Sequence, residues 1–464
     1  MFFSRLNGKS EFIIMKRNIM IFGVLLSFCL SNAQDAVKVP RFMNQPWKMH
    51  HIDRQSWNHN SLSPRDFNGD GFNDYVVIHE AEGLVSIIFH PGVNNRLYHQ
   101  WEKILIGKNA KDVEYGYAGD LDGDGNLDVV YVRGEGGAVH IIWGPDKSLA
   151  KDPSKWVNSE AIPSSIDQGA YLYCETYDIN QDGALDIVTG GRRYNSGKLN
   201  GLIWFEAPKN IKERRDLSKW AMHSIDPDLL SGHGFEIVDF NKDGHVDIVV
   251  ANPDWDTPDF EDAVLWYESP VPHSDAIKDK WKKHVVIKNQ QLFSKAQVGI
   301  GDLNQDGKTD LVVQSDNLIN YLEQQQNPDK WKVNIITKPE ITRWVTRPLE
   351  IVDLNGDGKL DIVGALIHNY GYTPVGKASV YWMEYLGEKP GVDNWVTHVI
   401  KFADGYFTGR SYNGEKWDHL KFVDLDKDGD LDIIGNCEEY YEIIGEERKT
   451  LLGVVWFENP TINP

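Results

Sequence analysis

Short apolar runs alternate with polar turns along almost the whole chain. Seven times, a polar stretch of the form D-x-[ND]-x-D-G-x-x-D is followed at once by β-branched and aliphatic residues, as in residues 310–313. Runs this short, bounded by turn residues, predict β-strands rather than helices. The seven polar stretches span residues 66–74, 120–128, 178–186, 239–247, 302–310, 353–361 and 424–432.

Four strands are predicted around each polar stretch. Strand A opens the repeat with a tryptophan, strand B runs into the polar stretch, strand C leaves it, and strand D is aromatic, as in residues 202–206. Successive stretches begin 54, 58, 61, 63, 51 and 71 residues apart, so the repeats cover nearly the whole chain. Seven such repeats predict an all-β, seven-bladed β-propeller with four-stranded antiparallel blades over residues 34–464, since radial repetition protects sheet edges.

The polar stretch has the spacing of a calcium loop, so we expect one calcium loop in each blade. Calcium takes six to eight oxygen ligands, which positions 1, 3, 5 and 9 can supply, and the glycine at position 6 permits a sharp turn. Seven equivalent ions would be structural, because a catalytic ion would be singular. The expected calcium ligands are Asp66, Asn68, Asp70, Asp74, Asp120, Asp122, Asp124, Asp128, Asp178, Asn180, Asp182, Asp186, Asp239, Asn241, Asp243, Asp247, Asp302, Asn304, Asp306, Asp310, Asp353, Asn355, Asp357, Asp361, Asp424, Asp426, Asp428 and Asp432.

Calcium binding also accounts for most of the acidity of the chain. The formal net charge is −21, and 23 aspartates occupy expected ligand positions. The charge therefore says little about the substrate, although no nucleic-acid partner is expected for so acidic a protein.

The N-terminus predicts export. Lys16 and Arg17 precede an apolar stretch over residues 19–30 and small residues at 31–33, the pattern of a signal peptide over residues 1–33. The apolar stretch is too short to span a membrane, so no membrane insertion is expected. We expect a monomer, periplasmic or secreted, with the periplasm favoured. Cys174 and Cys437 fall in distant repeats, and no disulfide between them is expected.

The repeat resembles a known family. Its D-x-[ND]-x-D-G-x-x-D-[IL]-V core and the W-F-E-N-P strand at residues 456–460 are similar to those of FG-GAP or VCBS repeat propellers, over roughly residues 40–460. Such propellers include adhesins, lectins and enzymes, so the resemblance implies a fold and calcium binding but no single activity.

The position of the calcium loop predicts which end of the propeller is functional. Because that loop joins strand B to strand C, the A–B and C–D connections emerge at the opposite end, and these connections differ between repeats. The four tryptophans outside strands A and D fall in them and are candidate sugar platforms, or else anchors of their own loops: Trp57, Trp255, Trp344 and Trp417.

Arginines gather at the same end. Guanidinium groups bind carboxylate and sulfate bidentately, so they favour an anionic oligosaccharide as partner, although salt bridges to loop acids are the alternative. The candidate substrate-binding arginines are Arg65, Arg133, Arg192, Arg193, Arg343 and Arg410, with Arg347 as a candidate catalytic residue.

Histidine and tyrosine supply candidate acid and base groups. His50, His223, His284 and His398 repeat in strand A and are expected to be structural. The candidate catalytic residues in the irregular connections are His233, His368 and Tyr171, and His233 lies between two glycines that permit close approach of a ligand. Alternatively, one transition metal could be bound by His79, His233, His368 and His419.

These residue types fit β-elimination on a uronate. That reaction needs a cation at the carboxylate, a base for the C5 proton and an acid for the group leaving C4. The chain is similar to exported ulvan oligosaccharide dehydratases and to the propeller of aldos-2-ulose dehydratases. The resemblance implies removal of water from a terminal uronic acid of sulfated, rhamnose-containing oligosaccharides, leaving a 4,5-unsaturated end.

Three alternatives remain open. The enzyme could be a polysaccharide lyase, if the leaving group is a sugar. The protein could be a carbohydrate-binding propeller, although connections that differ between blades favour one composite site and hence an enzyme. A glycosidase would need a carboxylate pair, for which Asp254, Glu438 and Glu439 are candidates.

Overall fold

The computed structural model describes most of the chain after residue 45. The described residues are 46–460, except for 57, 109, 135, 193–200, 253–262, 289–297, 316–317, 338, 340, 343–345, 367–375, 388–393, 404–414, 439–441, 445–446 and 450–451. The expected signal peptide lies outside them. No helix in the described part is both long and apolar enough to cross a bilayer.

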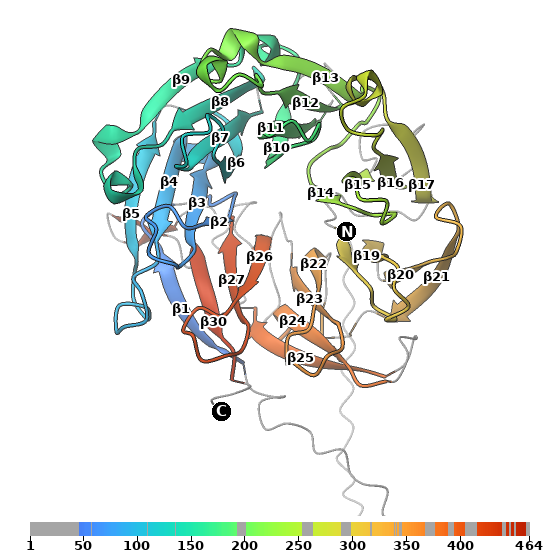
Figure 1. Cartoon of the computed structure of the whole chain (residues 1–464). Coiled ribbons are helices and arrows are strands. Elements are labelled where there is room, and N and C mark those ends of the chain that lie inside the picture. Colours follow the sequence, from blue (N-terminus) through green and yellow to red (C-terminus); the bar gives the residue numbers. More distant parts are fainter. Residues whose placement is uncertain are drawn as a thin grey trace, which may run out of the picture. The chain divides into compact units, whose positions relative to one another are not determined.

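Seven four-stranded antiparallel sheets surround a common axis (Figure 1). This confirms the predicted seven-bladed β-propeller. Each blade is given from its innermost to its outermost strand: β2 (Ser63–Arg65), β3 (Asp74–His79), β4 (Leu84–Phe89) and β5 (Glu102–Gly107); β6 (Val113–Gly119), β7 (Asp128–Arg133), β8 (Ala138–Trp143) and β9 (Val157–Ala161); β10 (Tyr171–Tyr177), β11 (Asp186–Gly191), β12 (Leu202–Glu206) and β13 (Ala221–Asp226); β14 (Phe235–Val238), β15 (Asp247–Asn252), β16 (Ala263–Glu268) and β17 (Lys282–Lys288); β18 (Gly299–Gly301), β19 (Asp310–Ser315), β20 (Leu318–Gln324) and β21 (Trp331–Thr337); β22 (Thr346–Val352), β23 (Asp361–Leu366), β24 (Ala378–Tyr385) and β25 (Trp395–Phe402); and β26 (Trp417–Val423), β27 (Asp432–Cys437), β30 (Val454–Glu458) and β1 (Lys48–Asp53).

Structural blades and sequence repeats are offset by one strand. The strand that opens each repeat is the outermost strand of the preceding blade, as β5 is for the blade that begins with β2. The chain then crosses to the axis to begin the next blade. The polarity predicted from the loops holds, because the antiparallel pairing puts the A–B and C–D connections at one end and the B–C loops at the other.

The N-terminal strand closes the ring, a point that the sequence leaves open. Strand β1 pairs with β30, so Lys48 lies opposite Glu458. The last blade is thus built from both ends of the described chain (Figure 1).

Tryptophans and histidines of the outer strands pack in the blades as predicted. The strand D residues Trp204, Trp266, Trp382 and Trp456 are fully buried. Each contacts a strand A histidine that also bonds the glutamate ending strand D, as His50 Nε2 does at 2.7 Å from Glu458. His223, His284 and His398 repeat this contact, which confirms their structural role.

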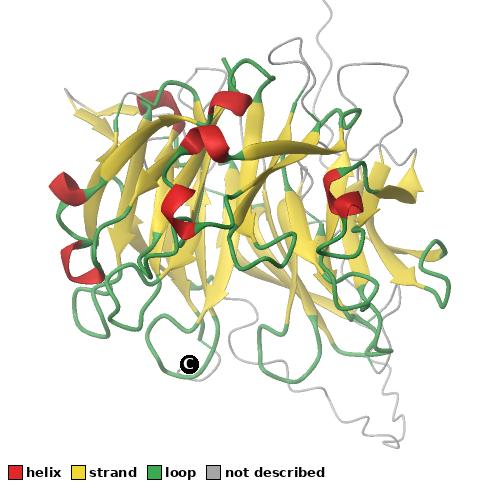
Figure 2. Ribbon diagram, turned by 45° about the horizontal axis from the view of Figure 1, so that its top comes forward, coloured by secondary structure: helices red, strands yellow, loops and turns green. Residues whose placement is uncertain are grey.

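Loops and short 3-10 turns join the strands (Figure 2). The helical turns within the described residues are η1 (Glu80–Glu82), η2 (Lys147–Leu149), η3 (Pro153–Lys155), η4 (Pro163–Ser165), η5 (Ile211–Glu213), η6 (Leu217–Lys219) and η7 (Asp275–Lys278). Cys174 and Cys437 are buried free thiols, as expected. A further hairpin joins β28 (Glu442–Ile444) to β29 (Glu447–Lys449).

Candidate functional site

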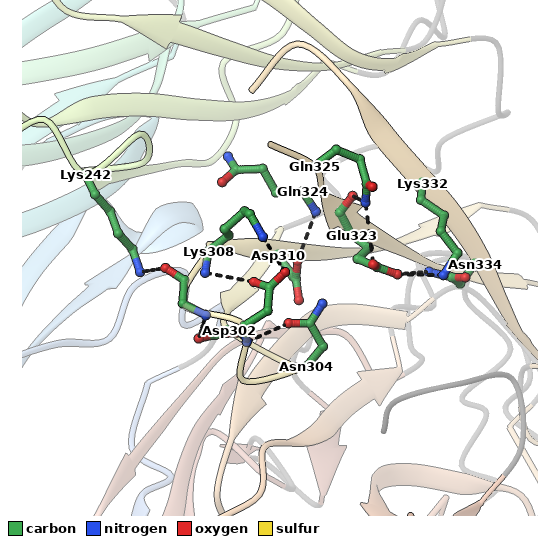
Figure 3. A network of polar contacts seen from close by, with 12 residues as sticks. Lys242, Asp302, Asn304, Lys308, Asp310, Glu323, Gln324, Gln325, Lys332 and Asn334 are labelled. Atoms are coloured by element: carbon green, nitrogen blue, oxygen red, sulfur yellow. Dashed lines mark hydrogen bonds and ion pairs between the residues drawn. The ribbon is translucent and has the colours of Figure 1, made fainter. Parts of the chain in front are cut away.

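The seven acidic loops adopt one conformation. Their sixth-position glycines all have positive φ, from 85° at Gly358 to 105° at Gly429. In the fifth loop, Asp302 Oδ2 accepts a hydrogen bond of 2.8 Å from the Gly307 amide, and Lys242 from the preceding loop donates to the Gly307 carbonyl oxygen (Figure 3). The predicted turn is therefore present, and neighbouring loops contact one another.

The ninth-position aspartates have a second role that sequence reasoning missed. Asp74 accepts one hydrogen bond from the Phe67 amide at the loop and one from the His90 amide at the end of strand D. Burial raises the pKa of Asp74 to about 7. Six further aspartates accept from strand D ends in the same way: Asp128, Asp186, Asp247, Asp310, Asp361 and Asp432. Each ties its loop across the blade.

The donor atoms in these loops fit a hard cation. In the second loop, oxygens of Asp120, Asp122 and Asp128 lie within 4.8 Å of one another, and the seventh loop repeats this cluster. The five other loops have asparagine at position 3. Arg215 Nε lies 2.6 Å from Asp122 Oδ2, so a protein cation already neutralises part of the second loop.

At the opposite end, three predicted site residues are buried. Tyr171 is fully buried and donates its hydroxyl hydrogen to the Ser165 carbonyl oxygen at 3.0 Å. Trp417 is also fully buried, and its Nε1 donates to Ser379 Oγ at 2.8 Å. Both polar groups are thus bonded to other groups inside the protein, and the catalytic role of Tyr171 and the platform role of Trp417 stay predictions. His233 is 6% exposed.

The described arginines do not form one cluster. Arg133 Nε donates to the Lys111 carbonyl oxygen at 2.8 Å at the nonrepeating end. Arg65 ends β2 next to the acidic loop, and its guanidinium lies 4.9 Å from the Tyr117 ring centroid. Arg192 bridges by its backbone to Ser231. The remaining predicted residues lie outside the described side chains: His368, Arg193, Arg343, Arg347, Arg410, Trp57, Trp255 and Trp344.

The sequence also offers two alternative sets of residues, ligands for a transition metal and acids for a glycosidase. His79 forms a cluster with Asp53 and His59, and neither His233 nor His419 belongs to it. Glu438 forms an ion pair with Lys416. Asp254 and Glu439 are not among the described residues.

Charged side chains converge instead on the propeller axis. The residue three positions before each loop lies on the innermost strand and always pairs with the third residue of strand C, as Glu175 pairs with Val188 and Glu236 with Val249. Five residue types occupy this position in the seven blades, and three of the residues are glutamates: Ser63, Tyr117, Glu175, Glu236, Gly299, Glu350 and Lys421. We call this set the axial ring.

The acids of the axial ring influence one another. Burial raises the pKa of Glu236 well above its ordinary value, and the nearby charges of Glu175 and Glu350 raise it further. Burial raises the pKa of Glu350 to about 7, while Lys421 acts in the opposite direction. The ring is thus able to hold protons near neutral pH.

An aromatic layer lies beside the axial ring, towards the nonrepeating end. The Tyr115 and Tyr173 ring centroids are 4.3 Å apart, and the His419 ring centroid is 5.2 Å from that of Tyr115. Tyr173 donates to Glu175 at 2.7 Å, which joins the layer to the ring. Tyr173 and Glu236 also line a narrow pocket with Phe235. Charged residues on inner strands are the sequence signal that could have pointed to this site.

Comparison with known proteins bears on the fold. The profile of the FG-GAP-like repeat matches residues 66–131, 120–189 and 302–364. The chain contains FG-GAP-like repeats. No curated protein matches the sequence with significance.

Three solved structures are similar to this chain at low sequence identity. An Agrocybe aegerita lectin that recognises non-reducing terminal N-acetylglucosamine is 16% identical, with a TM-score of 0.43, over 76% of this chain and 83% of the lectin. The Photorhabdus luminescens Tc holotoxin pore is 16% identical, with a TM-score of 0.33, over 83% of this chain and 16% of the toxin chain. An α-L-arabinofuranosidase from Lactobacillus brevis is 11% identical, with a TM-score of 0.31, over 78% of this chain and 98% of the enzyme. At these TM-scores the likenesses carry no argument about activity.

Proposed function

We propose that the protein is a carbohydrate-active enzyme with one composite site at the nonrepeating end of the propeller axis. The observation that carries this proposal is the contact of Tyr115, Tyr173 and His419 with one another and with the axial acid Glu175. A multivalent lectin would repeat its binding residues in each blade. The seven axial positions instead hold five residue types, with glutamate in only three blades, as one asymmetric catalytic site requires.

The proposed reaction is β-elimination from a uronate-containing oligosaccharide. Burial raises the pKa of Tyr173 and of Tyr115 well above their ordinary values, so both hydroxyls stay protonated and suit donation to a leaving group. His419 is the proposed base for the C5 proton. Lys421, whose charge lowers the pKa of Glu175 and of Glu350, would neutralise the sugar carboxylate.

The leaving group decides between a dehydratase and a lyase. If hydroxide leaves C4 of a terminal uronic acid, the product is an unsaturated, otherwise intact oligosaccharide. If a sugar leaves, the chain is cleaved. We favour the dehydratase acting on ulvan-like, sulfated oligosaccharides, because the pattern of the whole chain resembles that of ulvan oligosaccharide dehydratases.

Glycoside hydrolysis is the second candidate, because three carboxylates meet on the axis. Glycosidases pair a protonated carboxylic acid with a carboxylate. Glu236 and Glu350, whose pKa values are raised by burial, would supply the acid. Burial raises the pKa of Glu175 as well, but the hydrogen bond from Tyr173 and the charge of Lys421 oppose this, so Glu175 would supply the carboxylate.

One experiment separates these reactions. The purified protein is incubated with ulvan, alginate, pectin and glycosaminoglycan fragments while absorbance near 235 nm and product masses are followed. Loss of one water without cleavage supports dehydration, cleavage with absorbance supports a lyase, and cleavage without absorbance supports hydrolysis. Unchanged substrates would refute an enzymatic function for these sugars.

Two further proposals concern the scaffold. We propose that calcium ions occupy the acidic loops and stabilise the blades, with Asp120, Asp122 and Asp128 holding one of them. We also propose export to the periplasm through residues 1–33.

A further inference from the structure

We propose that Asp53, His59 and His79 form a zinc site at the seam where the propeller ring closes. One donor atom from each residue lies within 4.8 Å of those of the other two. All three side chains are at most 1% exposed. Imidazole nitrogen and carboxylate oxygen are the donors that zinc prefers, whereas the acidic loops offer oxygen alone.

The three residues come from different elements at the seam. Asp53 ends β1, the strand that closes the last blade, and His79 ends β3 in the first blade. His59 lies in the connection between these blades and forms an isolated β-bridge with His79. The His59 carbonyl oxygen also accepts a hydrogen bond of 2.8 Å from Asn436 of β27. A bound ion would therefore join the last blade to the first.

Each of the two histidines has a ring nitrogen, Nδ1, that is available to coordinate a metal. His59 Nε2 lies 3.1 Å from Asp53 Oδ2, and His79 Nε2 lies 2.9 Å from Ser86 Oγ. The Nδ1 atoms of both rings are buried without a hydrogen-bond partner among the described residues. A buried polar atom without a partner is costly, and a metal ligand removes that cost. The bond between His79 Nε2 and Ser86 Oγ would hold the His79 ring in the orientation a metal needs.

An equivalent seam elsewhere satisfies its aspartate without histidines. Between the third and fourth blades, Lys283 Nζ lies 2.7 Å from Asp226 Oδ2, just as Lys103 Nζ lies 2.7 Å from Asp53 Oδ2. There Tyr267 donates its hydroxyl hydrogen to Asp226 at 2.7 Å, and the carboxylate is satisfied without histidine. His59 gives Asp53 the one hydrogen bond that Tyr267 gives Asp226. His79 and the two Nδ1 atoms without a partner go beyond what that bond requires.

Lys103 competes with the metal for Asp53. A zinc ion bound by the carboxylate would be repelled by the ammonium group 2.7 Å away from Asp53 Oδ2. Replacement of Lys103 by methionine keeps the length of the side chain and removes its charge. Lys103→Met should therefore bind zinc at least about 10-fold more tightly, because this repulsion is relieved.

The test uses metal-free protein in saturating calcium, which fills the oxygen-only loops. Cobalt(II), the spectroscopic substitute for zinc, should bind one equivalent with visible bands of a nitrogen-coordinated site, and zinc should displace it. His59→Gln and His79→Gln should each weaken binding at least about 100-fold. The matched control His223→Gln removes a buried strand A histidine outside the cluster and should retain full binding.

Unchanged binding in the His59→Gln and His79→Gln variants would overturn the proposal, as would the absence of a one-equivalent site in the wild type. If these variants do not fold, X-ray absorption of zinc-loaded wild-type protein decides. Outer-shell scattering from two imidazoles is the expected result, and an oxygen-only shell refutes the site. Neither readout depends on the proposed enzymatic activity.

Discussion

The Tyr173 hydroxyl donates a hydrogen bond of 2.7 Å to Oε1 of Glu175, two positions further along the same innermost strand. Tyr173→Phe removes this proton donor and leaves the ring in place. If Tyr173 protonates the leaving group, kcat should fall about 10²- to 10⁴-fold. Turnover of the substrate identified by absorbance or mass measures the effect.

Tyr171→Phe is the control for this variant. It lies two residues earlier on β10 but donates to the Ser165 carbonyl oxygen inside the core. Its loss should cost about 1 kcal/mol of stability and leave kcat unchanged. Equal activity losses in the two variants would contradict the assignment of Tyr173.

The axial ring should make the free energy of unfolding depend on pH. Burial raises the pKa of Glu350 to about 7 in the folded protein from 4.5. The folded state then holds a proton that the unfolded chain releases, so this group stabilises the fold below about pH 4.5 and loses that contribution as pH rises to about 7. Glu350→Gln should therefore be more stable than wild type at pH 8 by about 1–3 kcal/mol.

Urea unfolding at pH 5 and pH 8 measures this difference. Arg65, Glu175, Glu236 and Lys421 share the environment of Glu350, so the comparison is made within one variant pair at each pH. A variant that is destabilised equally at both pH values would show that Glu350 does not titrate in this range.

Calcium removal should destabilise the whole propeller. If the ions join B–C loops that also tie the ends of strand D, a chelator should lower the melting temperature, and added calcium should restore it. Differential scanning calorimetry in chelator and in calcium tests this. Magnesium is the control, because it demands a smaller, octahedral site. An unchanged melting temperature would refute structural calcium.

The loop turn can be tested separately from the ion. Gly358 has φ of 85°, and a Cβ atom there would meet no atom within 4 Å. Gly358→Ala should therefore cost about 1–2 kcal/mol through backbone strain alone. Chemical denaturation in saturating calcium measures the cost. A neutral effect would mean that the loop relaxes into another conformation.

Local features of the fold are predictable from the sequence. The turn around Gly358 and the acceptor atoms of Asp353 lie within one nine-residue stretch, so their spacing determines the loop. The position of that loop between strands B and C also sets strand polarity. The same logic placed the nonrepeating connections at the opposite end.

The sequence placed the candidate site at the nonrepeating end of the propeller but did not identify its residues. Tyr171 and Tyr173 lie on one short strand, but a shift in the pairing register between them puts Tyr171 in the core and Tyr173 beside the axis. Sequence pattern does not show such a β-bulge, because it arises from the pairing of β10 with β11.

By itself, the sequence determined the seven repeats, the acidic turns and the all-β propeller, because each follows from residues close together in the chain. Tertiary structure alone decided that β1 pairs with β30, and that Glu236, Glu350 and Lys421 meet on the axis. These contacts join residues far apart in the chain, and only the closure of the ring brings them together.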